Sequence, residues 1–499
     1  MSQPAAPPRR TSPCALVTPP GLATLVCLAC ATLPAVLGAP AAARAAGLGV
    51  PDLGAASLGQ GAATVAAPDD LSALYYNPAA LAGRPGLRLL VDGRAVQHSV
   101  TFQRLQADGS NPDNFARVDN AGGPRLSPLV AVAWGFSLAG LPVAVAAGGY
   151  PASGYSGYSF PDPAGLRAEL GTCPTCNTEN ARRSPQRYSL ISNSSSSFTL
   201  AIGAAVQLTD WLRVGFALQD AMVSIKTRQS IGANPFAAGE FAGYDALLAV
   251  DAKSSFTPTG ALGASATLGD FRFGASLQLP YDVKAHGTLG VDVPQVLATV
   301  GAKVTGDQTD VALHLPWIAR VGARWVRPAF EVELALTWDA WSRYHEVTFS
   351  PQGVAFEIPN RPNVVVPDIH LIKGMKDAQS LRLGGTLRPS ELIAPALSWL
   401  TLRAGAVLET SAVPDERLAV DQAHWERLGL SLGATARLAG FDLTAGFMHF
   451  VMPGKQVRSS AVVQPAPLRT ADQATVVGNG DYAASVDLVG VSLSRAIDL

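Results

Sequence analysis

The sequence predicts an all-β protein: a transmembrane antiparallel up-and-down β-barrel of about 14 strands, with an N-terminal plug in its lumen. Three observations predict this fold. Charged residues are scarce, short segments alternate between apolar and polar residues, and the connections between those segments alternate between short and long. Together these features are typical of a closed sheet with one face against lipid.

The composition is poor in charge. Of 499 residues, 48% are hydrophobic and 15% are charged, against roughly 25% charged residues in soluble domains. A helical membrane protein would need repeated apolar runs of about 20 residues. The one stretch that approaches this, Leu129 to Ala147, contains Gly140 and Pro142, which favour two short strands joined by a tight turn. The net charge of −1 and the lack of a basic cluster exclude nucleic-acid binding.

The N-terminus has the order of a secretory signal peptide over residues 1–45. Arg9 and Arg10 precede an apolar stretch from Ala15 to Leu37, which a run of small residues follows. Ala43 and Ala45 satisfy the A-x-A cleavage pattern, so we expect the mature chain to begin directly after Ala45. The alternative is an uncleaved transmembrane anchor, but three prolines interrupt the apolar stretch and no stop-transfer pattern follows it.

Two of the five cysteines, Cys173 and Cys176, lie in the predicted mature chain. A C-x-x-C pair can be a redox motif or half of a zinc site, but the sequence lacks the second pair that a structural zinc site needs. In an exported protein, a small disulfide that closes a surface loop is favoured. We therefore predict a disulfide between these cysteines and no metal site.

From about residue 86 onward, apolar residues occupy every second position of short segments. Phe271, Phe273 and Leu277 share one face of such a segment, while Arg272 and Gln278 share the other. A period of two is the period of a β-strand. The predicted strands lie near 86–104, 126–139, 141–151, 187–208, 211–226, 249–268, 270–286, 312–326, 328–348, 379–389, 398–410, 427–438, 440–451 and 481–495.

The connections separate a barrel from a β-sandwich, which would show the same alternation. Short turns, such as those at Thr209-Asp210 and Ala439-Gly440, alternate along the chain with long polar loops. Transmembrane barrels place short turns in the periplasm and long loops outside the cell. The sheet must close, because no water in lipid could satisfy the amides of a free edge. Residues 86–499 are therefore predicted to form the barrel.

Residues 46–85 differ from the rest of the mature chain. The segment is rich in Gly and Ala, shows no clear alternation, and is too short to fold alone. If the first strand begins near residue 86, this segment can pack inside the lumen. We predict that it forms a plug there.

This segment also resembles a known family. The run from Leu58 to Ala63 and the sequence DDLSALYYNPAAL from Asp69 to Leu81 resemble the N-terminal hatch of the FadL/TodX outer-membrane transporters. Weaker likenesses follow at 315–317, 337–344 and 402–418. The resemblance implies a barrel with the strand number counted above, in the bacterial outer membrane, that takes up long-chain fatty acids or aromatic hydrocarbons. It also implies that the cargo moves from a groove among the loops to an interior site and leaves sideways into the membrane.

The resemblance makes Asn77, Pro78 and Ala79 candidate gating residues, because they match the Asn-Pro-Ala of the family's hatch. Asp69 and Asp70 are further candidates in the same segment. The residues alone allow a simpler interpretation, since Asn-Pro is a common turn initiator and can end one element before the first strand. The two aspartates either anchor the hatch or are solvated loop acids.

A lumen-facing cation is a suitable anchor for the carboxylate of a fatty acid. Alternatively, such cations pair with acids of the lumen, Glu409 for example. The alternation of the predicted strands turns five candidate anchors inward: Arg213, Arg272, Arg382, Arg403 and Arg437.

Two other classes of function compete with transport of hydrophobic molecules. A barrel enzyme needs converging His, Ser and acidic groups, and the seven histidines follow no motif spacing, so we predict no catalytic residue and no cofactor. A porin for polar solutes is the stronger alternative, but it would have an open lumen.

The expected partners are the hydrophobic cargo, outer-membrane lipid and the barrel-assembly machinery, and we expect a monomer. Many outer-membrane proteins end in an aromatic residue that the assembly machinery reads. This chain ends in Leu499 instead.

Overall fold

The computed structural model describes residues 52–151, 157–163, 165, 177–233, 240–360, 362–466 and 475–498. The chain divides into two compact units, Met1–Ala42 and Ala43–Leu499. The first unit lies outside the described residues, as do the predicted cleavage site and the pair Cys173 and Cys176. None of the described helices is long and apolar enough to cross a membrane.

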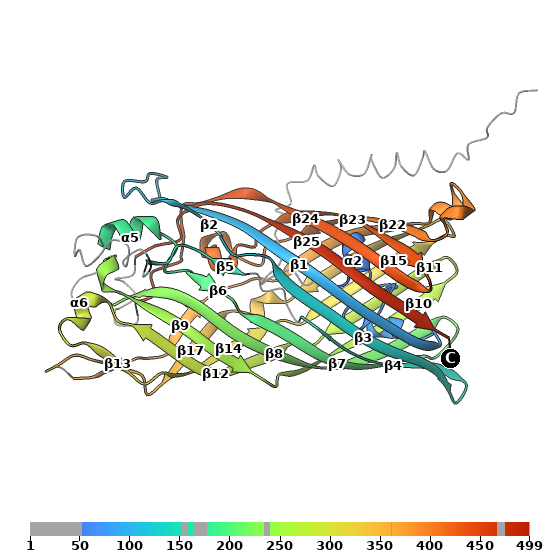
Figure 1. Ribbon diagram of the computed structural model, residues 1–499, viewed down its shortest axis with the longest axis horizontal. Coiled ribbons are helices and arrows are strands. Elements are labelled where there is room, and N and C mark those ends of the chain that lie inside the picture. The colour runs from blue at the N-terminus through green and yellow to red at the C-terminus, as the bar shows by residue number, and fades with distance from the viewer. Residues whose placement is uncertain are drawn as a thin grey trace, which may run out of the picture. The chain divides into compact units, whose positions relative to one another are not determined.

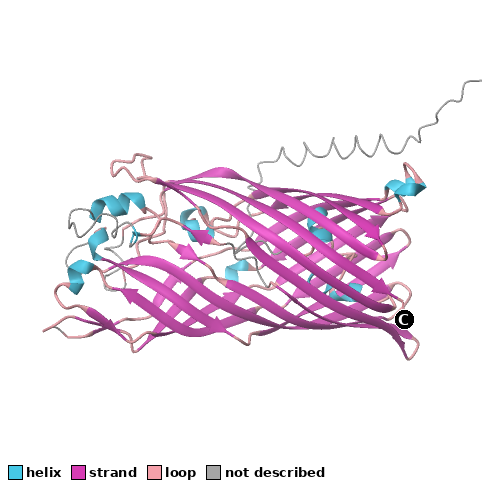
Figure 2. Ribbon diagram, viewed as in Figure 1, coloured by secondary structure: helices cyan, strands magenta, loops and turns pink. Residues whose placement is uncertain are grey.

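Fourteen antiparallel strands form the wall of a closed barrel (Figures 1 and 2), so the predicted fold class is confirmed. Nine of them are continuous: β1 (Gly86–Arg104), β3 (Arg125–Leu138), β4 (Leu141–Tyr150), β7 (Ser196–Gln207), β8 (Leu212–Gly232), β22 (Leu400–Glu409), β23 (Arg427–Leu438), β24 (Phe441–Val457) and β25 (Gly480–Ile497).

Each of the other five consists of two segments in line, which share their neighbours in the sheet. They are β9 (Asp245–Ser254) with β10 (Pro258–Leu268), β11 (Phe271–Gln278) with β12 (Tyr281–Asp292), β14 (Gln308–Leu315) with β15 (Ile318–Val326), β16 (Phe330–Asp339) with β17 (Glu346–Gln352), and β20 (Ile369–Ile372) with β21 (Ala378–Leu387).

Short elements lie among the connections. The strands are β2 (Arg117–Asp119), β5 (Tyr158–Ser159), β6 (Ser192–Asn193), β13 (Lys303–Thr305), β18 (Ala355–Glu357) and β19 (Val364–Val365). The helices are α5 (Asn177–Arg183), α6 (Gln295–Ala298), η3 (Ala242–Tyr244), η4 (Trp341–Arg343), η5 (Pro389–Glu391), η6 (Pro395–Leu397), η7 (Asp415–Arg417) and η8 (Val420–Gln422).

The sheet closes because β1 has a partner on each side. It pairs with β3, and over its whole length with the last strand, from Leu87 opposite Ile497 to Arg104 opposite Gly480. The predicted hairpin within Leu129–Ala147 is confirmed as β3 and β4. No strand edge is left along this seam, as a sheet in lipid requires.

Strand β7 begins later than the predicted segment at 187–208. Arg187 and Tyr188 are instead buried at the long-loop end, where the Arg187 guanidinium contacts the Asp245 carboxylate at 2.8 Å and the Tyr188 hydroxyl donates to the same carboxylate. This ion pair is long-range, so the local alternation of residues could not reveal it.

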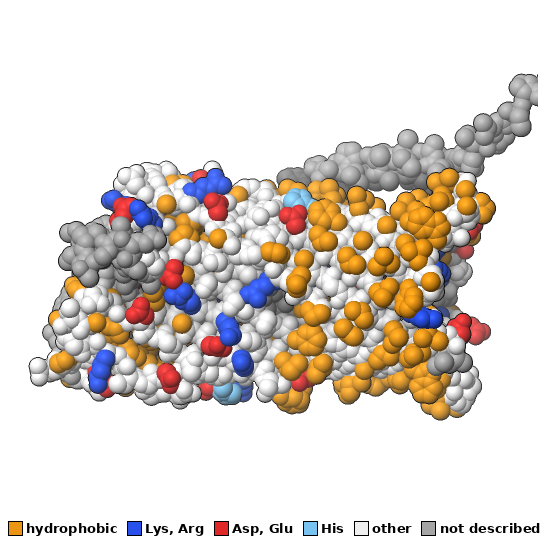
Figure 3. Space-filling view, in the orientation of Figure 1, with side chains coloured by type: hydrophobic (Ala, Val, Ile, Leu, Met, Phe, Trp, Pro, Cys, Tyr) orange, Lys and Arg blue, Asp and Glu red, His pale blue; other side chains and the backbone are white. Residues whose placement is uncertain are grey.

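The outer face of the barrel carries an apolar belt over the half that ends in the short turns (Figure 3). Its alternation is as predicted: the side chains of Phe271 and Phe273 face outward, 49% and 42% exposed, while Gln278 is buried inside. At the long-loop edge of the belt, the rings of Trp317 and Trp338 pack edge to face, with centroids 4.8 Å apart. Tryptophan is enriched at membrane–water interfaces, so this pair marks one border of the belt.

Candidate functional site

Residues 52–85, called the lumen segment below, lie inside the ring of strands. The segment contains α2 (Ala55–Gly59), α3 (Ala73–Tyr76) and the 3₁₀ turn η1 (Pro78–Leu81), and it is buried along nearly its whole length. Helix α2 contacts β22 to β25, while η1 contacts β7, β8 and β10 on another part of the wall. The segment therefore reaches across the lumen.

Inward-facing glycines let the backbone of the lumen segment approach the wall closely. A Cβ atom built on Gly405 or Gly384 would overlap the backbone of Gln60, and one built on Gly263 would overlap the side chain of Asn77. The small face of each strand, visible in the sequence as alternating Gly and Ala, is therefore a docking surface rather than the lining of an open pore.

Asn77 links the lumen segment to the wall. Its side-chain amide donates to the carbonyl oxygen of Val65 at 2.9 Å and to that of Ala264, on β10, at 3.1 Å. Its side-chain oxygen accepts a hydrogen bond from the backbone N–H of Ala79 and so caps η1, whose first residue is Pro78. The Asn-Pro-Ala sequence thus forms a turn, as the simpler interpretation held, and it also contacts the barrel wall.

Asp69 and Asp70 have different surroundings. The Asp69 carboxylate lies 3.1 Å from the guanidinium of Arg324 and 3.3 Å from that of Arg403. Burial would raise the pKa of Asp69, but these two arginines and Arg84 outweigh it and hold the pKa below its usual value. Asp70 accepts a hydrogen bond from the backbone N–H of Ser72, and burial raises its pKa. Asp69 is the anchored acid of the two.

An acid on the wall holds the middle of the lumen segment. Glu333 accepts hydrogen bonds from the backbone N–H groups of Val65 and Ala66, at 2.6 and 2.8 Å. Its other oxygen lies 2.7 Å from Arg324, which sits directly opposite it on the neighbouring strand and also contacts Asp69. The sequence analysis missed this network. Alternation marks both side chains as inward, but only the pairing register brings them together.

Two of the predicted carboxylate anchors already have acidic partners. Arg382 contacts Asp52 of the lumen segment at 2.7 Å and Glu409 at 2.6 Å, and Arg403 contacts Asp69. The alternative interpretation, that such arginines pair with lumen acids, therefore describes their geometry. These contacts join the wall to the lumen segment.

The other three predicted anchors lie near the short-turn end. The Arg213 guanidinium donates a hydrogen bond to the side-chain oxygen of Gln207 at 3.2 Å. Arg272 is the second residue of β11, directly after a short turn. The exposed Arg437 pairs with Asp442 at 2.6 Å beside another short turn. The structure brings none of these three together with the outer pocket described next.

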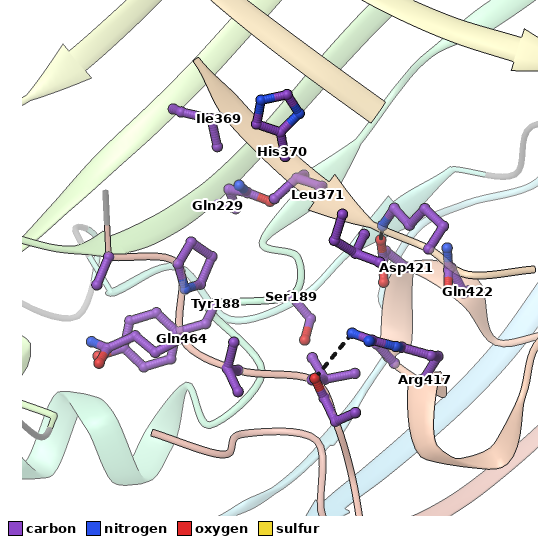
Figure 4. A pocket seen from close by; sticks show the side chains of 18 of the residues that line it. Tyr188, Ser189, Gln229, Ile369, His370, Leu371, Arg417, Asp421, Gln422 and Gln464 are labelled. Atoms are coloured by element: carbon purple, nitrogen blue, oxygen red, sulfur yellow. Dashed lines mark hydrogen bonds and ion pairs between the residues drawn. The ribbon is translucent and has the colours of Figure 1, made fainter. Parts of the chain in front are cut away.

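A pocket of about 330 Å³ opens among the loops at the long-loop end of the barrel (Figure 4). Ile369, Leu371 and Val462 give it apolar walls. Its charged lining residues are two cations, Arg417 and Lys373, and two acids, Asp368 and Asp421. Lys373 pairs with Asp421, and Arg417 donates to the carbonyl oxygen of Ala461 at 3.2 Å but forms no ion pair within the described residues. Such a pocket fits an apolar molecule with an anionic end.

A second cavity, of about 100 Å³, adjoins this pocket and shares Leu371, Lys373 and Gln422 with it. Its further walls include the apolar side chains of Ile225, Leu313, Val347, Phe349 and Tyr344. The two cavities together form a continuous space among the loops, with polar and apolar side chains in both parts. Its residues could not be named from the sequence, because they come from many distant parts of the chain.

The wall is interrupted beside β4. Its ladder with β7 ends where Tyr150 faces Thr199, and farther toward the long loops β8 pairs with the short β6 instead. A hollow of about 470 Å³, the upper groove, lies at this break, and Pro151, Ser196 and Met222 belong to its lining. Below it lies a larger apolar hollow of about 990 Å³, the lower groove, between β1 and β10.

Comparison with known proteins identifies the family. The sequence matches the family described as outer membrane protein transport protein (OMPP1/FadL/TodX) over residues 36–494. The chain belongs to the OMPP1/FadL/TodX family. This membership places the protein in the outer membrane, as predicted.

Solved structures of other OMPP1/FadL/TodX proteins share the fold. A FadL homologue of Pseudomonas aeruginosa is 14% identical and superposes with a TM-score of 0.69, over 90% of this chain and 100% of the other. The toluene transporters TodX of P. putida and TbuX of Ralstonia pickettii are 16% and 15% identical, with TM-scores of 0.59 and 0.55, over 90% of this chain and 99% of theirs. The chain has no match among curated protein sequences.

Proposed function

We propose that this protein is a passive outer-membrane channel for hydrophobic small molecules, with long-chain fatty acids as its cargo. The observation that carries the proposal is the amphipathic pocket at the long-loop end, which continues into an adjoining cavity with apolar walls at Leu313 and Phe349. The related P. putida and R. pickettii proteins are named toluene transporters. A hydrophobic cargo for this member is therefore consistent with its family.

One cation of the pocket favours a fatty acid over an aromatic hydrocarbon: Lys373 pairs with Asp421, but Arg417 forms no ion pair within the described residues. Arg417 and Lys373 lie among aliphatic side chains, and a carboxylate is the group that pairs with such cations most strongly. Toluene offers no charge to them. In this proposal the carboxylate binds at Arg417 and Lys373 while the alkyl chain extends toward Leu313 and Phe349.

The lumen segment acts as a movable hatch in this proposal, with Asn77, Pro78 and Ala79 as gating residues. Hydrogen bonds and ion pairs, for example those of Asn77 and Asp69, join it to the wall. Apolar side chains of the segment, such as Leu74 and Leu81, also pack in one cluster with small wall residues such as Ala201. A small displacement can break the directional contacts without unfolding the barrel. A polar-solute porin, the competing function, would need this lumen to be open at rest.

The lateral exit has a candidate place. Below the break beside β4, the lower groove is lined both by outward-facing Leu200 and Ile202 and by inward-facing Ala201. A fatty-acid tail is disfavoured in water by about 0.8 kcal/mol per methylene, so delivery along this groove into lipid avoids that cost. The same physics makes passive uptake into the membrane favourable.

Uptake by cells that carry or lack the protein tests the proposal. Labelled oleate should enter faster in cells with the protein, and a labelled hydrophilic sugar should not. Uptake of the sugar alone would favour the porin. Uptake of toluene without oleate would keep the hydrophobic channel but replace the fatty acid with an aromatic cargo.

A further inference from the structure

The upper groove at the break beside β4 has the composition of a binding site for a polar anionic headgroup. Seven of its fifteen lining residues are serines, among them Ser196, Ser224 and Ser255. Its two charged residues are both cations. Lys253 is exposed on the outer face of β9, whereas Arg125 shares the inward face of β3 with Leu129 and reaches the groove at the break. The lining therefore offers hydroxyl groups and positive charge, and no carboxylate opposes them.

The part of the chain that the structure describes supplies no partner for these cations. Within the described residues, the side chains of Arg125 and Lys253 take part in no hydrogen bond or ion pair. Lys284, on the outer face of β12, also takes part in no hydrogen bond or ion pair within the described residues. His286 of β12 lies directly opposite Lys253, and Lys284 is two residues before His286, so Lys284 is diagonal to Lys253. Side chains in such diagonal positions are roughly 7–8 Å apart, a spacing that lets two ammonium groups hold one phosphate.

Other charges on this face are paired, which makes the unpaired cations distinctive. Lys226 contacts Asp251 across β8 and β9 at 2.9 Å, and His286 contacts Asp310 across β12 and β14 at 2.6 Å. No acid is therefore left beside Lys253 on these neighbouring strands. Figure 3 shows Lys and Arg side chains directly beside the apolar belt, on its long-loop side.

The lower groove supplies the other half of an amphiphile site. Its lining includes the outward-facing Leu200, Ile202 and Leu218, and Phe256, which is 72% exposed. The upper and lower grooves share Phe198, and Ser255 of the upper one is next to Phe256 of the lower one. A hydroxyl-rich cationic hollow thus lies directly above an apolar hollow that faces the membrane.

We propose that these two grooves bind one lipid of the outer leaflet, a phosphorylated and multiply acylated glycolipid of the lipid A type. Its phosphates bind Lys253, Lys284 and Arg125, its sugar hydroxyls meet the serines, and its acyl chains fill the lower groove. Basic clusters at the edge of an apolar belt are typical binding sites for anionic lipid headgroups. The bound lipid would then cover the break in the wall from outside.

Lipid A fits better than the transported fatty acid. A fatty acid has one carboxylate and one chain. The upper groove offers two cations and seven serines, and the lower groove, at about 990 Å³, exceeds the need of one chain. The lower groove is also the lateral exit proposed for the cargo, so this proposal rests in part on the proposed function, but lipid retention can be measured by itself. This measurement requires no transport.

The experiment measures lipid retention by native mass spectrometry. Purified barrel is freed of lipid, mixed with lipid A, and compared with the K253Q/K284Q double variant and with R125Q. K303Q is the matched control, because Lys303 is an exposed lysine on the distal β13 hairpin. Each lysine removed should weaken lipid A retention about fivefold, since a basic residue near an anionic lipid contributes an energy of that order. K303Q should retain lipid A like the wild type.

Further probes separate the outcomes. Dephosphorylated lipid A should bind the wild type weakly, and equal binding with and without phosphates would overturn the proposal. The proposal would also be overturned if the K253Q/K284Q variant retained lipid A as fully as the wild type. Heat-modifiable migration on a gel would confirm that this variant is a folded barrel. If that variant lost oleate uptake while keeping lipid A, the cations would belong to the cargo path. If the wild type took up no oleate, the proposed function would be wrong, but the lipid retention measurement would still decide the lipid A proposal.

Discussion

The amide of Asn77 donates a hydrogen bond to the carbonyl oxygen of Ala264, 187 residues away in the chain, at 3.1 Å. This contact connects the Asn-Pro-Ala turn of the lumen segment to β10. The same amide group also donates to Val65, so one side chain holds two parts of the lumen segment and the wall together. The gating role proposed for this turn rests on that connection.

Asn77→Ala should loosen the lumen segment without preventing barrel assembly. The substitution leaves two buried carbonyl oxygens without their donor, at a cost of about 1–3 kcal/mol in local stability. We expect more frequent open events in single-channel recordings in planar bilayers. Asn363→Ala is the control, because Asn363 is exposed among the loops. Identical recordings for Asn77→Ala and the wild type would reduce the turn to a structural role.

Asp69 should make closure sensitive to acid. Its pKa is lowered in the folded state, so the stability that its ionised form contributes is complete above the usual value of 3.8 and declines as the pH falls below it. We expect wild-type conductance to rise below about pH 4. Asp69→Asn should conduct more than the wild type at pH 7 and should lack this part of the acid response. Equal pH profiles for the two proteins would contradict the assigned anchor.

Gly405→Leu should displace the lumen segment, because a side chain at this position would overlap the backbone of Gln60. We expect a folded barrel with a raised basal conductance and faster protease cleavage within residues 52–85. Gly93→Leu is a matched control on β1, since Gly93 faces outward and a Cβ there would meet nothing within 4 Å. If the Gly405→Leu channel stayed closed, the prediction would be wrong, because the lumen segment would then accommodate the leucine side chain without moving away from the wall.

Charge removal in the outer pocket should separate the two classes of cargo. K373Q/R417Q removes both cations, and hydrogen bonds to charged groups contribute about 1.5–3 kcal/mol. We therefore expect the initial rate of oleate uptake to fall at least about tenfold. Toluene uptake should change little, because toluene has no charged group. An equal loss for both molecules would point to a distorted pocket rather than to carboxylate binding.

The strand pattern could be predicted in detail from the sequence. The alternation over residues 271–279 placed Phe271 outward and Gln278 inward, as the structure has them. The breakers Gly140 and Pro142 correctly indicated a hairpin in the longest apolar stretch. These predictions succeed because strand alternation and turns are local properties of the chain.

The candidate site could be predicted only in part. The sequence singled out Asn77 and Asp69, and it marked Arg382 as facing inward. It could not tell that Arg382 lies between Asp52 and Glu409, or that Glu333 binds the backbone of Val65. The family resemblance implied a groove among the loops, but the residues of the outer pocket, among them Arg417 and Lys373, were not predicted.

The sequence by itself determined a closed fourteen-stranded barrel, its apolar outer belt, and a segment at 46–85 that needs a partner to pack against. The tertiary structure decided which charges meet, where the wall is interrupted beside β4, and where pockets form. The reason is physical. Alternation and turn chemistry act within a few residues, whereas the register between strands brings together side chains that are distant in the chain. Arg324 and Asp69, 255 residues apart, make contact only because the barrel closes around the lumen segment.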